Sequence, residues 1–175
     1  MTGFLQKALS AAEVIDRITR AAGKLGTLLL LALIALVGWN VAGRYVVGGG
    51  SVALQELEWH LLAPVAILGI TLLVLEKGHV RVDMVYDRMP ERAQTWLDLI
   101  SMICGIVIAV LFIKYSIGFV ESSWSLREGS ADPGGLPARY LLKAMIPLGF
   151  ALFALQCLAN AIRYAVKLAD DRETP

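Results

Sequence analysis

The sequence predicts an all-α integral membrane protein with four transmembrane helices, preceded by an N-terminal amphipathic helix at the membrane interface. Hydrophobic residues make up 57% of the 175 residues and charged residues only 18%, whereas a soluble domain carries about 25% charged residues. The apolar residues also form four long blocks, each close to the roughly 20 residues that cross a bilayer as a helix. These blocks occupy more than half the chain and leave no room for a separate soluble domain.

The first 24 residues have an amphipathic pattern typical of a helix that lies in the membrane interface. Apolar residues at helical spacing form one face, and charged residues lie opposite: Phe4, Leu5, Ala8, Leu9, Ala11, Ala12, Ile15, Ile18 and Ala22 against Lys7, Glu13, Asp16, Arg17 and Arg20. An amphipathic helix packed on a partner protein is the alternative. The segment is too polar for a cleaved signal peptide, so the first span is expected to act as a signal anchor.

The predicted membrane domain covers residues 25–163 and is followed by a cytoplasmic tail at 164–175. Its spans are expected at about 25–47, 54–75, 96–120 and 139–163.

Glycine, serine and proline mark the ends of these spans. Gly48-Gly49-Gly50 should end the first helix, and Ser51 can cap the second. Proline at Pro90 suits the start of the third, and Asp132-Pro133-Gly134-Gly135 predicts a turn before the fourth. Further features inside the spans are a kink at Pro64 and a helix-packing face of small residues at Ser101, Gly105 and Ala109.

The distribution of lysine and arginine predicts the orientation. Eleven lie at the N-terminus, in the 76–95 loop or after the last span, and three lie in the other two loops as Arg44, Arg127 and Arg139. The positive-inside rule therefore places both termini and the 76–95 loop in the cytoplasm, and residues 48–53 and 121–138 outside.

The titratable residues do not form a recognisable catalytic, metal or cofactor site. His60 and His79 lie about 28 Å apart along a helix, too far to share a haem iron. Glu56 and His60 share a helix face without an evident third metal ligand, so an interfacial polar contact is expected. Cys104 and Cys157 should behave as small hydrophobic residues.

The central parts of the spans are almost free of charge. Lys114, Lys143 and Asp98 all lie near span ends, whereas an ion or substrate pathway usually places ionisable groups at mid-membrane. We therefore expect that the chain is not a pump or channel by itself.

Two stretches carry a family resemblance: "LQELEWHLLAPVAILGITLLVLEKGHVRVDMVYDRMP" and "ESSWSLREGSADPGGLPARYLLKAMIPLGFALFALQ". A glutamate early in the second span, a mid-span glycine, an H-x-R-V-D ending and a late P-L-G-F resemble the small membrane subunit, DctQ type, of tripartite ATP-independent periplasmic (TRAP) transporters. The resemblance implies a non-catalytic subunit without cofactor in a sodium-coupled transporter of the bacterial inner membrane. That subunit braces the scaffold of a large subunit that carries the substrate.

The resemblance implies three kinds of partner: a large many-helix membrane subunit, a periplasmic solute-binding protein and the lipid bilayer, with no nucleic acid. The residues expected in subunit contacts or structural roles are Glu56, Glu58, Gly69, His79, Arg81 and Asp83. Those expected to help dock the binding protein are Arg44, Arg127, Glu128 and Asp132; the alternative for these loops is a solvated loop that carries no partner.

Alternatives remain for the loop after the second span and for the whole chain. A solvated loop that only sets orientation explains Lys77, Arg88 and Arg92 well, but explains His79 and Asp83 poorly. For the whole chain, the alternatives are the membrane anchor of an oxidoreductase complex and a self-contained small transporter.

Overall fold

The computed structural model describes residues 2–46, 48–76, 78 and 86–170. Four long helices account for most of them, and each is long and apolar enough to cross a membrane: α1 Thr2–Val46, α2 Val52–Leu75, α4 Glu91–Ser125 and α5 Arg139–Asp170. The described residues contain no strand. The predicted fold class, an all-α protein with four transmembrane helices, is confirmed.

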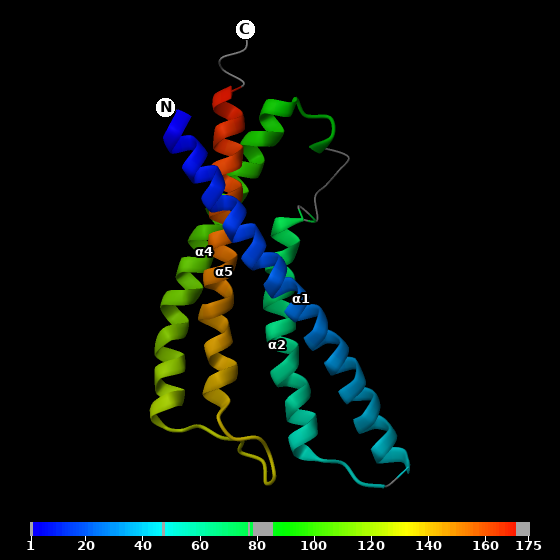
Figure 1. Ribbon diagram of the computed structural model, residues 1–175. Helices are drawn as coiled ribbons and strands as arrows, with labels where there is room; N and C mark the ends of the chain where they lie inside the picture. The colour runs from blue at the N-terminus through cyan, green and yellow to red at the C-terminus, as the bar shows by residue number, and fades with distance from the viewer. Residues whose placement is uncertain (1, 47, 77, 79–85, 171–175) are drawn as a thin grey trace.

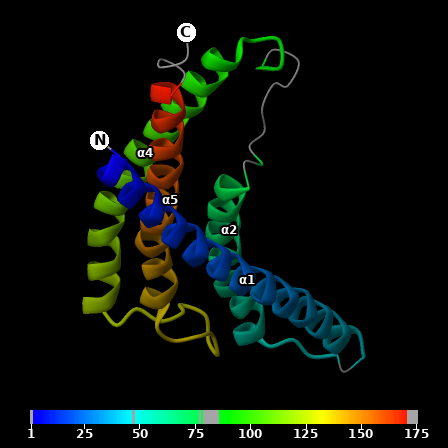
Figure 2. The same ribbon diagram turned by 45° about the horizontal axis from the view of Figure 1, so that its top comes forward.

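The helices form two hairpins, α1 with α2 and α4 with α5 (Figure 1). Packing is densest within each hairpin, and α5 joins the two because it contacts both α1 and α2. The start of α1 and the end of α5 lie at one end of the bundle in both views (Figures 1 and 2), which we call the terminus end. The α1–α2 and α4–α5 connections lie at the opposite end, the loop end.

The packing seam of α4 follows a strict seven-residue repeat. Its buried residues are Thr95, Met102, Ala109, Ser116 and Ser123. Such a repeat keeps one stripe of a helix against its neighbour, as in left-handed coiled coils. Gly105 and Ala109 of the predicted small-residue face lie in this contact, and a Cβ at Gly105 would lie 3.0 Å from Cys157 Sγ of α5. Ser101, by contrast, is exposed, because it falls outside the repeat.

Small residues also allow close approach elsewhere in the bundle. A Cβ at Gly23 would lie 2.8 Å from the Leu72 side chain, so α1 and α2 approach closely there. A Cβ at Gly149 of α5 would overlap the side chain of Ile67 on α2. Both contacts would need rearrangement if a methyl group were added.

The predicted N-terminal helix and the first span are one continuous helix. With 45 residues, α1 is about 67 Å long, more than twice the bilayer core. Within residues 4–22, Ala12 and Thr19 are buried. The position of this segment in the membrane interface stays a prediction, as do the domain limits at 24 and 163. The last helix continues beyond that second limit to Asp170.

The predicted end signals agree with the helix bounds. The first helix ends at Val46, just before the glycine triplet, and Ser51 caps α2 through its hydroxyl, which accepts from Leu54 N at 3.4 Å. Pro90 stands at the N-cap of α4, so the helix begins five residues before the expected 96. Pro64 is buried inside α2.

Candidate functional site

The loop between α4 and α5 begins with a tight helix ending. The amide of Arg127 donates to Trp124 O at 3.0 Å, and the amide of Glu128 donates to Ser123 O at 3.0 Å. This pair of bonds is a Schellman motif, which requires a left-handed residue after the helix. Arg127 takes that position with φ 45°, where glycine is usual.

The rest of the loop is closed on itself by backbone hydrogen bonds. The predicted turn forms: Gly135 N donates to Asp132 O at 3.0 Å, and Gly134 has φ 81°. Ser130 N donates to Leu136 O at 3.0 Å. These bonds give the loop a defined shape before any partner is considered.

A buried carboxylate of α2 holds this loop in place. Glu56 is 2% exposed and accepts from Ser130 Oγ, from Leu136 N at 2.6 Å and from Arg139 Nη2 at 3.0 Å. The last contact is also an ion pair with the first residue of α5. Because a buried carboxylate needs both hydrogen bonds and a counter-charge, the three donors together explain how it is tolerated there.

Gly135 is required by the same contact. A Cβ at this position would overlap Ser130 Oγ and would lie 2.7 Å from Glu56 Oε2. The backbone of the turn therefore packs directly against the bound carboxylate, and no larger residue fits without moving it.

A second ion pair joins the loop to α5. Lys143 Nζ donates to Glu128, and this hydrogen bond holds the pKa of the Glu128 carboxyl below its usual value. The same ammonium lies 3.9 Å from the centre of the Phe119 ring on α4, within the range of a cation–π contact. Lys143 thus links the loop to both helices of the second hairpin.

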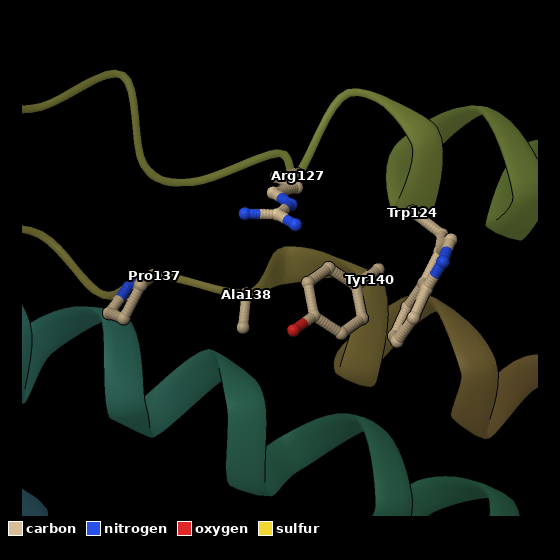
Figure 3. A pocket seen from close by; sticks show the side chains of 5 residues that line it. All are labelled: Trp124, Arg127, Pro137, Ala138 and Tyr140. Carbon is tan, nitrogen blue, oxygen red and sulfur yellow. The ribbon is translucent and has the colours of Figure 1, made fainter.

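A surface pocket lies beside this loop (Figure 3). It has a volume of about 390 Å³ and is lined by Trp124, Arg127, Pro137, Ala138 and Tyr140. The Trp124 and Tyr140 rings meet edge to face, with centroids 4.7 Å apart. Ala138, like Arg127, has a left-handed backbone, with φ 64°. Two strained residues that are not glycine therefore border one pocket, and such strain often clusters at functional sites.

The other predicted docking residues are more dispersed. Asp132 is exposed at the turn, on the same loop as Arg127 and Glu128. Arg44 is exposed near the end of α1, beside the backbone of Gly50. The structure therefore brings three of the four predicted docking residues onto one loop.

The residues predicted to make subunit contacts or to have structural roles lie in different places. Glu58 accepts from Asn40 Nδ2 at 2.9 Å and so joins α2 to α1. Gly69 is exposed, with open space where a Cβ would stand. His79, Arg81 and Asp83 lie outside the described residues.

The terminus end contains a polar network that the sequence did not reveal. Gln156 is fully buried on α5; its Oε1 accepts from Thr19 Oγ1 at 2.7 Å, and its Nε2 donates to Asp16 Oδ1 at 3.0 Å. Asp16 also pairs with Arg163 at 2.7 Å. Asn160 Nδ2 donates to Val74 O at 3.0 Å near the end of α2. Three helices therefore meet through side chains of one face of α5.

His60 contacts the backbone of Glu56 and not its carboxylate. Its Nδ1 lies 2.8 Å from Glu56 O, one turn earlier on α2. Among the described residues, no group of three or more His, Cys, Asp or Glu side chains could hold a metal ion.

The sequence did not identify Ser130 and Arg139 as partners of Glu56, or Lys143 as the partner of Glu128. Residue chemistry alone could have narrowed the choice of partners, because the carboxylates of Glu56 and Glu128 need nearby cations. Few lysines and arginines lie outside the predicted cytoplasmic segments. Sequence spacing could not select the partners, since Ser130 and Arg139 lie 74 and 83 positions from Glu56.

Comparison with known families decides the relationship. The profile of the family described as "Tripartite ATP-independent periplasmic transporters, DctQ component" matches residues 17–166. The chain belongs to this family. The resemblance noted from the sequence is therefore confirmed. The chain is a component of a TRAP transporter, with four helices long and apolar enough to cross a membrane.

Similar proteins carry related names. A protein of Haemophilus influenzae named as a TRAP transporter small permease protein is 29% identical over 103 residues, 59% of this chain and 62% of that protein. The sialic acid TRAP transporter small permease protein SiaQ of Vibrio cholerae is 26% identical over 83 residues, 47% of this chain and 45% of that protein.

A longer relative also matches. The isethionate TRAP transporter permease protein DctMQ of Oleidesulfovibrio alaskensis is 23% identical over 143 residues, 77% of this chain and 22% of that protein. The chain thus spans less than two thirds of the length of each of these relatives.

Proposed function

We propose that this chain is the non-catalytic small permease subunit of a sodium-coupled TRAP transporter in the bacterial inner membrane. In this role it braces the scaffold of a large subunit that carries the substrate and the sodium sites. The family match supports this proposal over an oxidoreductase anchor or a self-contained transporter. The relative named DctMQ also supports it, since that protein carries the matching segment within a much longer chain.

One structural observation carries the bracing role. The four ion pairs in which both partners are described residues lie at the two ends of the bundle: Arg139–Glu56 and Lys143–Glu128 at the loop end, Arg163–Asp16 and Lys167–Glu91 at the terminus end. Between them the helices present apolar side chains outward. A helical bundle held by ion pairs at both ends, with an apolar surface between them, suits a scaffold that packs against another subunit in the membrane.

The loop end is proposed to face the periplasm and to help dock the solute-binding protein through Arg44, Arg127, Glu128 and Asp132. The structure supports this because the loop is shaped in advance by Glu56 and by its own backbone bonds. Preformed surfaces bind with a smaller loss of conformational entropy. Glu58, Gly69, His79, Arg81 and Asp83 are proposed to serve structure or contacts with the large subunit.

Co-purification tests the bracing role. The chain, tagged and co-expressed with the large subunit, is expected to recover it in detergent, and both together with the binding protein should restore sodium-dependent uptake in liposomes. Recovery of the chain alone, or uptake by the chain alone, would contradict the proposal.

Single cysteines test the orientation. Ser51→Cys and Ala131→Cys should be labelled from outside, and Arg92→Cys only from the cytoplasm. These sites are chosen because all three are exposed. A reversed pattern would contradict the periplasmic position of the loop.

A further inference from the structure

We propose that the pocket beside the loop accepts an acidic side chain of the periplasmic binding protein, with Arg127 as its ion-pair partner and Trp124 and Tyr140 as the walls. The inference rests on the function proposed above, because it names the chemistry by which the docking surface would recognise its partner. It adds two residues, Trp124 and Tyr140, and a specific role for Arg127.

The charges of the loop support an anionic guest. Arg127 forms no ion pair with an acid of the described part of the chain, while its neighbours are already paired: Glu128 with Lys143, and Glu56 with Arg139. The Arg127 side chain is exposed. An uncompensated guanidinium at a surface attracts a carboxylate and can bind it through two parallel hydrogen bonds.

The shape of the pocket favours a protruding side chain over a free small molecule. Trp124, Arg127 and Pro137, three of its five lining residues, are exposed, so the pocket opens to water. Small-molecule sites usually enclose most of their ligand. Figure 3 shows the Arg127 guanidinium and the Tyr140 hydroxyl turned toward the same side of the pocket.

The residue types also match those that dominate protein interfaces. Tryptophan, tyrosine and arginine are the residues most enriched among binding hot spots, and all three line this pocket. The indole and phenol rings support each other edge to face. They offer rigid apolar walls for the methylene groups of a glutamate or aspartate whose carboxylate meets the guanidinium.

The backbone at Arg127 is a separate indication. A Schellman ending favours glycine at this position, yet arginine is held there with φ 45°. The backbone is therefore strained at Arg127, the residue that supplies the positive charge of the pocket. A structural role alone would be filled better by glycine, and this difference provides the test.

The experiment measures the affinity of the purified, solute-loaded binding protein for the transporter reconstituted in nanodiscs. Arg127→Glu and Arg127→Gly should each weaken binding at least about tenfold, with Tyr140→Phe giving a smaller loss. Arg127→Gly should keep or raise thermal stability, which separates loss of the guanidinium from loss of the loop. Arg92→Glu, the same charge change at an exposed site of the terminus end, should leave the affinity unchanged.

A charge-swap panel identifies the guest. Among binding-protein variants with single surface acids changed to arginine, at least one should bind Arg127→Glu better than it binds the wild-type transporter. Wild-type affinity in both Arg127→Glu and Arg127→Gly would overturn the proposal.

The result can be separated from that of the proposed function. Every variant is first checked for recovery of the large subunit. Intact complexes with unchanged docking would overturn the pocket proposal alone, whereas failure of the wild-type chain to recover the large subunit would contradict the proposed function itself.

Discussion

The two ends of the bundle are each held by a buried polar side chain, but they differ in what that side chain holds. At the loop end a carboxylate, Glu56, binds a backbone amide, a hydroxyl and a guanidinium, and so fixes a loop against a helix. At the terminus end a neutral amide, Gln156, binds Thr19 and Asp16 and fixes helix against helix.

The difference is consistent with different tasks for the two ends. A loop has few apolar contacts of its own, so a charged, multiply bonded group is needed to order it. Helices that already pack along their length need only a directional contact that selects one alignment. Loss of the carboxylate should therefore disorder a surface, while loss of the amide should weaken the packing between hairpins.

The largest expected effect is at the loop end. Glu56→Ala removes the common acceptor of three donors and leaves Arg139 without its counter-charge. We expect trypsin to cleave after Arg127 at least about tenfold faster in the reconstituted chain, because the loop opens more often.

Glu58→Ala, two residues along α2, is the matched control and should cleave at the wild-type rate, since Glu58 binds Asn40 and not the loop. Equal cleavage of Glu56→Ala and wild type would show that the loop is ordered without the carboxylate.

The second effect is at the terminus end. Gln156→Leu leaves the buried hydroxyl of Thr19 without its partner, whereas Asp16 keeps its ion pair with Arg163. The substitution should cost about 1–3 kcal/mol of stability, measured by denaturant titration in micelles. Adding Thr19→Val should recover part of this loss, because a hydroxyl without a partner is then removed. Additive losses in the double variant would rule out a direct Thr19–Gln156 interaction. Leu155→Ala, at an outward-facing position of α5, provides the control.

A smaller effect is expected from the strained backbone of the loop. Ala138 has φ 64°, where glycine avoids the penalty of a Cβ but loses more entropy on folding. Ala138→Gly should therefore raise stability slightly, by about 0.5 kcal/mol. Ala131→Gly, in the same loop without a positive φ, should lower or not change it. A destabilised Ala138→Gly variant would mean that the methyl group packs usefully in the pocket.

The smallest effect concerns pH. Because the hydrogen bond from Lys143 lowers the pKa of Glu128 from its usual 4.5, the pair contributes stability above that value. This contribution is lost as the pH falls through the lowered pKa of the folded state. Thermal midpoints measured from pH 6 to pH 3 should fall less steeply in Glu128→Gln than in wild type. The difference should be modest, since water still reaches part of both side chains and weakens the pair. Identical slopes would exclude the pair as a source of acid sensitivity.

Much of the fold could be predicted because its signals are local. Gly48-Gly49-Gly50, Ser51 and the Asp132–Gly135 turn act within a few residues of themselves, and each marks the expected boundary. The length of the apolar blocks gave the four spans in the same way.

The contacts between distant segments could not be predicted. Glu56 was expected in a polar contact with His60 or with another subunit, but its donors lie more than 70 positions away, in the loop and at the start of α5. Gln156 and Asn160 are polar residues of the last helix, but nothing in the neighbouring sequence pairs them with Thr19 or with Val74 O. Such pairings depend on the angle between helices, which a single sequence does not contain.

The length of α1 has a mechanical consequence. Near its start it contacts α5 through Asp16 and Thr19, it meets α2 closely at Gly23, and near its end it contacts α2 again through Asn40. If the helix turned as a stiff rod about Gly23, a residue 20 positions away would lie about 30 Å from the pivot. A rotation of about 5° would then displace that residue by about 3 Å. The two ends of α1 would then move in opposite directions, so a displacement at one membrane face would cause a displacement at the other.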